Sequence, residues 1–124
     1  MSADSDATIV HLVERLRADP DGSGVVWSLD DDGAEVNVNL VRLEAEAEIA
    51  TNVNREVDVV IIVVAGSGWL DLEGHTQTLT RSVLALLPKG TPRSVLAGPD
   101  GIAYVTVHRR RAPLGITGIP SRQR

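Results

Sequence analysis

The sequence predicts an all-β domain preceded by one short helix, and two observations support this fold class. After residue 20, segments rich in Val, Ile, Leu and Thr recur at short intervals, and turn-forming clusters such as DDDG, EGH and PKGTP separate them. Before residue 20, the apolar residues instead follow the spacing of a helix. Many short strands at nearly regular spacing are typical of a β-sandwich or a β-barrel.

The leading helix is predicted from apolar residues at positions i, i+3, i+4 and i+7, namely Ile9, Leu12, Val13 and Leu16. Ser5 or Asp6 is available as its N-terminal cap, and Pro20 requires it to end. We therefore expect residues 1–20 to form a helix and its lead-in.

Seven segments have the composition of strands: GVVWSL, AEVNVNLVRL, DVVIIVV, GWLDLEG, TQTLTRSVLALL, RSVLAG and IAYVTVHR. The turns predicted between them include GSG and GPDG. We expect one domain over residues 21–112, followed by a C-terminal tail at 113–124. A chain of 124 residues is long enough to bury a core without metal or disulfide support.

Composition excludes several classes of function. The chain has no cysteine, so thiolate metal sites and disulfides are absent. Its net charge is −5 and it has only three aromatic residues, which argues against a nucleic-acid partner. The longest apolar run, Val57 to Ala65, is interrupted by Asp58 and is too short to span a bilayer, and no signal sequence is evident. We expect a cytoplasmic protein with no membrane partner.

Two stretches resemble the motifs of the cupin superfamily, whose members are small jelly-roll β-barrels. In TNVNREVDVVIIVVAGSG, residues Asn52, Asn54, Asp58 and Gly66 fall close to the His, His, Glu and Gly of the first cupin motif. In PKGTPRSVLA, Pro88 and Gly90 match the second motif, whereas Arg93 stands at its histidine place and Ala97 at its asparagine place. The resemblance covers roughly residues 36–108 and implies a cupin-type jelly-roll β-barrel.

The resemblance also implies a site. Cupins that hold iron, manganese, zinc or nickel use the residues at those motif positions, but an amide oxygen is a weak ligand and a guanidinium cannot coordinate. We therefore expect no metal and no cofactor. Asn52, Asn54, Asp58 and Arg93 would instead suit a small polar or anionic ligand, with Arg93 facing a carboxylate. Two alternatives remain open: the asparagines lie in a loop, or Asp58 and Arg93 form a structural ion pair.

Three functions follow from this reading. The first is a metal-free module that binds or senses a small molecule in a polar barrel pocket. The second is a metal-independent isomerase, cyclase or lyase, for which His108 is the histidine to consider as an acid or base. The third is a structural dimerisation domain. The resemblance to cupins also implies a homodimer, with Trp27 of GVVWSL as an apolar anchor in the interface.

Overall fold

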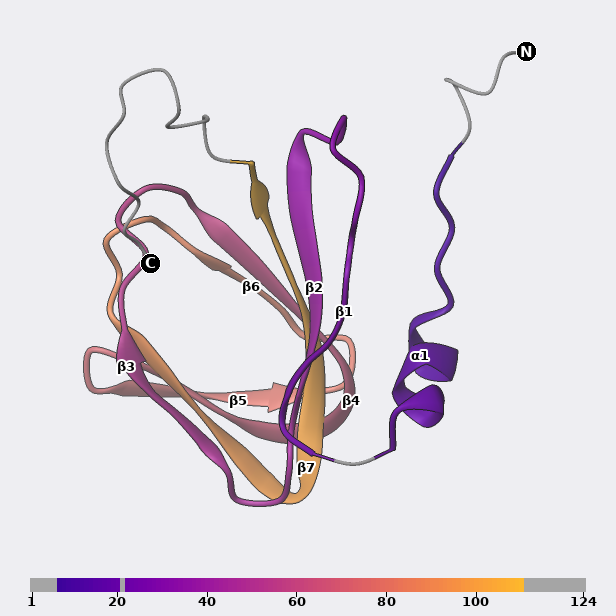
Figure 1. The fold of residues 1–124 in the computed structure, drawn as a ribbon. Helices are drawn as coiled ribbons and strands as arrows, with labels where there is room; N and C mark the ends of the chain where they lie inside the picture. The colour runs from indigo at the N-terminus through magenta and orange to yellow at the C-terminus, as the bar shows by residue number, and fades with distance from the viewer. Residues whose placement is uncertain (1–6, 21, 111–124) are drawn as a thin grey trace.

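The predicted all-β architecture is confirmed, and antiparallel strands make up nearly all of the regular secondary structure (Figure 1). A computed structural model of the chain describes residues 7–20 and 22–110. Its elements are α1 (Leu12–Ala18), β1 (Gly24–Ser28), β2 (Val36–Leu43), β3 (Glu48–Asn52), β4 (Val59–Leu72), β5 (His75–Thr80), β6 (Leu84–Leu87) and β7 (Arg93–Arg109).

The two longest strands, β4 and β7, join two groups of strands into a barrel. The C-terminal part of β7 pairs with β2, and its N-terminal part pairs with β3. In the same way, the first residues of β4 pair with β6 and its last residues pair with β5. One group therefore runs β1-β2-β7-β4-β6, and the other runs β3-β7-β4-β5. Figure 1 shows that these two groups enclose a common interior.

Both long strands contain segments that the sequence predicted to be turns. GSG does not end a strand, because β4 continues through it with shifts in its register between Val63 and Ala65 and between Gly66 and Gly68. GPDG likewise lies within β7. Glycines at these irregularities let the chain bend without ending the pairing. In contrast, TQTLTRSVLALL divides into β5 and β6, because Ser82 has a positive φ of 75°.

The core fills the space between the two groups of strands. It contains twelve buried residues, all of them apolar except for the phenol of Tyr104. The aliphatic residues among them alternate along β4 with residues that point outward, as a strand requires. The buried members are Leu43, Val57, Val59, Ile61, Val63, Leu70, Leu79, Leu87, Val95, Ala97, Ile102 and Tyr104.

Helix α1 is shorter than the sequence predicted. It begins at Leu12 rather than near Ile9, and Ile9 is 79% exposed. A short helix is stabilised mainly by packing its apolar face against the rest of the protein. Helix α1 buries no residue, so nothing extends it to Ile9. Ser5, Asp6 and the expected tail at 113–124 lie outside the described residues. Across residues 7–20 and 22–110, no helix is long and apolar enough to cross a membrane.

Candidate functional site

A cavity of about 430 Å³ lies inside the barrel. It is bounded by β1, β2, β3, β4 and β7 and by Ser23, which precedes β1. Most of its lining is aliphatic, which corrects the expectation of a mainly polar pocket. The apolar side chains are Val25, Val41, Leu43, Ile49, Ile61 and Val95, and the polar ones are Ser23, Asn52, Arg93, Tyr104 and Thr106.

Arg93 and Asn52 reach this cavity from neighbouring strands. They are directly opposite each other in the pairing of β3 with β7, so their side chains lie on the same face. The amide Nδ2 of Asn52 donates to the carbonyl of Ala50 at 3.0 Å and to that of Arg93 at 3.4 Å. Nη1 of Arg93 is buried and has no hydrogen-bond partner among the described residues. The sequence therefore predicted the inward direction of Arg93 correctly.

Tyr104 is the buried neighbour of Arg93 in the cavity. Its side chain is 3% exposed, and it projects inward from the middle of β7. Burial raises the pKa of Tyr104 to about 12, and the positive charge of Arg93 opposes part of that increase. Burial also lowers the pKa of Arg93, although a guanidinium stays charged in proteins. At neutral pH the cavity thus offers a cation and a protonated phenol side by side.

Asn54 and Asp58 do not line this cavity, which corrects their predicted place beside Arg93. The side-chain oxygen of Asn54 accepts from the backbone N–H groups of Glu56 and Val57, at 2.9 and 3.1 Å. Asp58 Oδ1 accepts from the backbone N–H of Lys89 at 2.9 Å. Asp58 therefore fixes the PKGTP turn, and it forms no ion pair with Arg93. Asn54 therefore lies in a loop, which is the first of the two alternatives left open by the sequence.

The donor set at the cupin metal positions does not fit a divalent metal ion. The Asn54 amide and the Asp58 carboxylate already accept backbone hydrogen bonds, and Arg93 would bring a positive charge to the ion. Over residues 7–20 and 22–110, no group of three or more His, Asp or Glu side chains is placed to hold a metal. No chemical step is assigned to a metal here.

The three histidines lie away from the cavity lining. His108 Nδ1 is 3.0 Å from the carbonyl oxygen of Arg109, its neighbour in sequence. His75 opens β5, and His11 precedes α1. None of the described residues that line the cavity is His, Asp or Glu, so the acid/base pair required by the enzyme hypothesis is not assembled there.

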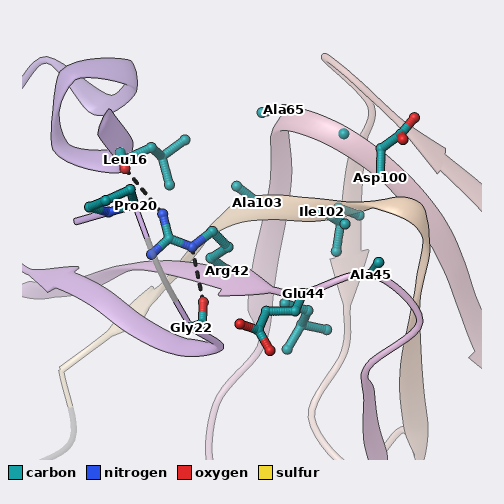
Figure 2. Close-up of a pocket in the computed structure, with 13 residues that line it drawn as sticks. Leu16, Pro20, Gly22, Arg42, Glu44, Ala45, Ala65, Asp100, Ile102 and Ala103 are labelled. Atoms are coloured by element: carbon teal, nitrogen blue, oxygen red, sulfur yellow. Dashed lines mark hydrogen bonds between the residues drawn. The ribbon is translucent and has the colours of Figure 1, made fainter. Parts of the chain in front are cut away.

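A second cleft, of about 400 Å³, lies between α1 and the outside of the barrel. Figure 2 shows Arg42 reaching from β2 to the carbonyls of Leu16 and Gly22, at 3.1 and 3.0 Å. Asp19 Oδ1 is 3.9 Å from the same guanidinium. Arg42 is thus already occupied in holding α1 to the barrel. In contrast, Arg93, which lines the barrel cavity, has a buried donor atom, Nη1, without a hydrogen-bond partner in the part of the chain that the structure describes.

Sequence reasoning did not identify Tyr104 and Thr106 as site residues. Both lie in IAYVTVHR, a run that reads as an ordinary core strand. Thr106 faces the cavity, and its Oγ1 accepts from Asn39 Nδ2 at 3.4 Å. The sequence feature that could have indicated them is the alternation of side chains along a strand, because residues two apart share a face. This alternation places Tyr104 and Thr106 on the same face of the strand, but it does not show that they lie near Arg93.

The shifted pKa of Tyr104 predicts a loss of stability at alkaline pH. Its folded pKa of about 12 lies above the ordinary value of 10.0, so the folded state holds the proton more tightly. This contribution is complete below pH 10 and disappears as the pH rises toward 12; two pKa units correspond to roughly 2 to 3 kcal/mol. Tyr104 is the only tyrosine, so tyrosinate absorbance reports its titration directly.

Denaturant unfolding at pH 8 and at several values above 10 measures this loss, and Tyr104→Phe serves as the control. The variant is expected to lack this component of the alkaline destabilisation. A tyrosinate transition at the ordinary pKa in the folded protein would contradict the buried position of Tyr104.

Comparison with known proteins identifies the fold. No family model and no curated protein matches the chain. It is similar to a cupin-2 domain protein from Shewanella frigidimarina, with a TM-score of 0.67, 16% identity, and 82% of this chain and 95% of that chain covered. A double-stranded β-helix protein from Klebsiella pneumoniae gives a TM-score of 0.65 and 19% identity, with 84% and 90% covered.

The cupin domain of Cnp3 from Schizosaccharomyces pombe gives a TM-score of 0.62 and 15% identity. The match covers 68% of this chain and 59% of that structure, so the chain spans less than two thirds of it. These identities are low, and the likeness is one of architecture. With its antiparallel strands and short N-terminal helix, the chain has the cupin fold, as its motifs predicted.

Proposed function

We propose that the barrel cavity binds a small organic carboxylate and that the protein is a metal-free binding or sensing module. The observation that carries this proposal is Nη1 of Arg93, which is buried without a hydrogen-bond partner among the described residues. A buried guanidinium donor left unpaired is costly, and a bound oxyanion would satisfy it. A carboxylate also matches the planar fork of arginine.

The rest of the lining defines the body of the ligand. Six aliphatic side chains surround the polar end of the cavity. They favour an apolar chain or ring attached to the carboxylate over a sugar or a polyanion, since hydroxyl groups there would lose their contacts with water. A volume of about 430 Å³ lies in the range of ordinary small-molecule sites. The protonated hydroxyl of Tyr104 provides a second donor near Arg93.

Binding is favoured over catalysis because the described lining contains a cation and a phenol but no general base. The enzyme hypothesis requires a histidine or carboxylate close to the ligand, and His108 and Asp58 are both elsewhere. The expected cytoplasmic location of such a module stays a prediction.

A thermal-shift series tests the proposal. Acetate, butyrate, hexanoate and benzoate are compared with hexanol and inorganic sulfate as matched controls. Carboxylates with an apolar body should raise the Tm, and a concentration of about 100 times Kd should stabilise by about 2.7 kcal/mol. For a domain of this size that corresponds to roughly 10 °C. Equal shifts with hexanol would remove the role of the charge, and no shift with any carboxylate would refute the proposal.

A further inference from the structure

A row of three polar side chains crosses the inner face of β1, β2 and β7 and ends at the barrel cavity. Ser28 is opposite Asn39 in the pairing of β1 with β2, and Asn39 is opposite Thr106 in the pairing of β2 with β7. The next residue in this row is Ile61 of β4, a member of the buried core. Ser28 is exposed, whereas Thr106 lines the cavity. The row therefore connects solvent with the cavity.

The hydrogen bonds along this row run in one direction, toward the cavity. Oγ of Ser28 donates to Oδ1 of Asn39 at 2.6 Å, and Nδ2 of Asn39 donates to Oγ1 of Thr106 at 3.4 Å. A separation of 2.6 Å is typical of O–H···O contacts and is shorter than N–H···O contacts, so the amide oxygen of Asn39 faces Ser28. Its amide nitrogen, which can only donate, then faces Thr106.

The hydroxyl of Thr106 is thus an acceptor on its outer side and keeps its own hydrogen for another partner. Within residues 7–20 and 22–110, Thr106 donates this hydrogen to no side chain or backbone group. Its aliphatic neighbours in the cavity, Ile61 and Val41, offer no acceptor. The acceptor for Thr106 therefore has to come from the molecule that fills the cavity.

This donor is separate from the one that would hold the carboxylate. Arg93 and Tyr104 are close enough for their charges to interact, and together they define the carboxylate end of the cavity. Thr106 lies two residues beyond Tyr104 on the same face of β7, a separation of about 7 Å at about 3.4 Å per residue. A carboxylate held by Arg93 and Tyr104 consequently leaves the Thr106 hydroxyl to another group of the same ligand.

The surroundings of Thr106 select the chemistry of that second group. Arg93 is the only cation in the described lining, so a second carboxylate beside Thr106 would be buried without compensation. A hydroxyl group would bring a hydrogen of its own among aliphatic side chains, whereas a carbonyl oxygen requires only a donor. We infer that the cavity recognises carboxylates that carry one uncharged carbonyl group, of a ketone or an ester, and that Thr106 determines this specificity. This inference rests on the proposed function.

Isothermal titration with matched pairs of ligands tests the role of Thr106. Monomethyl succinate, glutarate and adipate are compared with hexanoate, heptanoate and octanoate, because each ester has the chain length of its partner and adds a carbonyl. The measured quantity is the affinity for an ester divided by that for its partner, so that the lower hydrophobicity of the ester cancels between proteins. For at least one pair, this ratio should fall roughly 2- to 12-fold in Thr106→Val, which is the contribution of one neutral hydrogen bond.

Two further variants separate the hydroxyl from a change in shape. Thr106→Ser keeps the donor, and its ratios should match those of the wild type. Asn39→Asp puts an acceptor where Nδ2 now faces Thr106, so the hydroxyl hydrogen turns away from the ligand and the ratio should fall as in Thr106→Val. Asn39 is a positioning residue, and this variant also decides the outcome if Thr106→Val does not fold.

The possible failures of this inference and of the proposed function differ. If both classes of ligand bind and the ratios are the same in the wild type, Thr106→Val and Asn39→Asp, the role of Thr106 is overturned and the carboxylate site stands. If the ratio falls equally in Thr106→Ser, the hydroxyl is not the determinant. If none of these carboxylates binds the wild-type protein, the proposed function and this inference are both refuted.

Discussion

Replacing Arg93 with methionine is expected to abolish carboxylate binding while leaving the protein folded. In the ligand-bound state the guanidinium would be a buried, charge-assisted donor, and removing one partner of such a contact costs about 2 to 5 kcal/mol. That corresponds to a loss of affinity of roughly 30-fold to several thousand-fold. Without ligand, the free energy of unfolding should be unchanged or higher, because Nη1 of Arg93 has no hydrogen-bond partner to lose within residues 7–20 and 22–110.

Two control variants separate this prediction from a general effect on the barrel. Arg93→Lys keeps a positive charge but loses the planar fork, so binding should be intermediate. Asp58→Asn keeps the oxygen that accepts from Lys89 N–H, and binding should match the wild type. Isothermal titration with hexanoate measures the affinity of all three variants and of the wild type. Wild-type affinity in Arg93→Met would mean that the ligand, if any, lies elsewhere.

The ion-pair alternative makes the opposite prediction about stability. If Arg93 and Asp58 were paired, Arg93→Met would destabilise and Asp58→Leu would rescue it. The observed contacts of Asp58 run to the PKGTP turn instead. We therefore expect Asp58→Leu to destabilise on its own, and to do so equally in the presence of Arg93→Met.

The position of most strands and the direction of Arg93 could be predicted from the sequence. Alternation of apolar residues located most strands, and the resemblance of PKGTPRSVLA to the second cupin motif placed Arg93 on the inner face of β7, where it lines the cavity. The motif resemblance placed Asn54 and Asp58 there too, because it assigns positions without knowing which hydrogen bonds the loop requires. The Asn54 side chain accepts from Glu56 and Val57 nearby in sequence, as the loop alternative allowed, whereas the contact of Asp58 depends on how it meets Lys89 in space. Sequence spacing does not contain that information.

The two faces of β4 illustrate the same limit. DVVIIVV reads as a strand that is apolar throughout, which predicts burial but not on how many sides. Only the pairing with β6 and β7 shows that Val60 and Ile62 join an outward row ending in exposed leucines. The sequence did not predict the cavity for a related reason, since Arg93 and Tyr104 line one cavity only because β7 bends between them (Figure 1).

Strands β4 and β7 pass each other closely at Gly66 of β4 and Gly101 of β7, and Gly66→Ala is expected to be the most destabilising single change proposed for this fold. Gly66 has φ of +71°, a conformation that costs an L-residue energy. A Cβ at this position would also overlap the carbonyl oxygen of Gly101, where β4 and β7 pass each other. Backbone strain and overlap together should cost about 3 kcal/mol or more. The expected decrease in Tm is roughly 10 °C.

Gly74→Ala is the matched control for this change, because it separates the two causes. Gly74 also has a positive φ, of +90°, but a Cβ there would meet no atom within 4 Å. It should therefore cost only the backbone term, about 1 kcal/mol. Thermal unfolding of both variants measures the difference, which isolates the close approach of Gly101 to Gly66. If both variants lost the same stability, that approach would not be limiting, and the match of Gly66 to the cupin motif would reflect its positive φ alone.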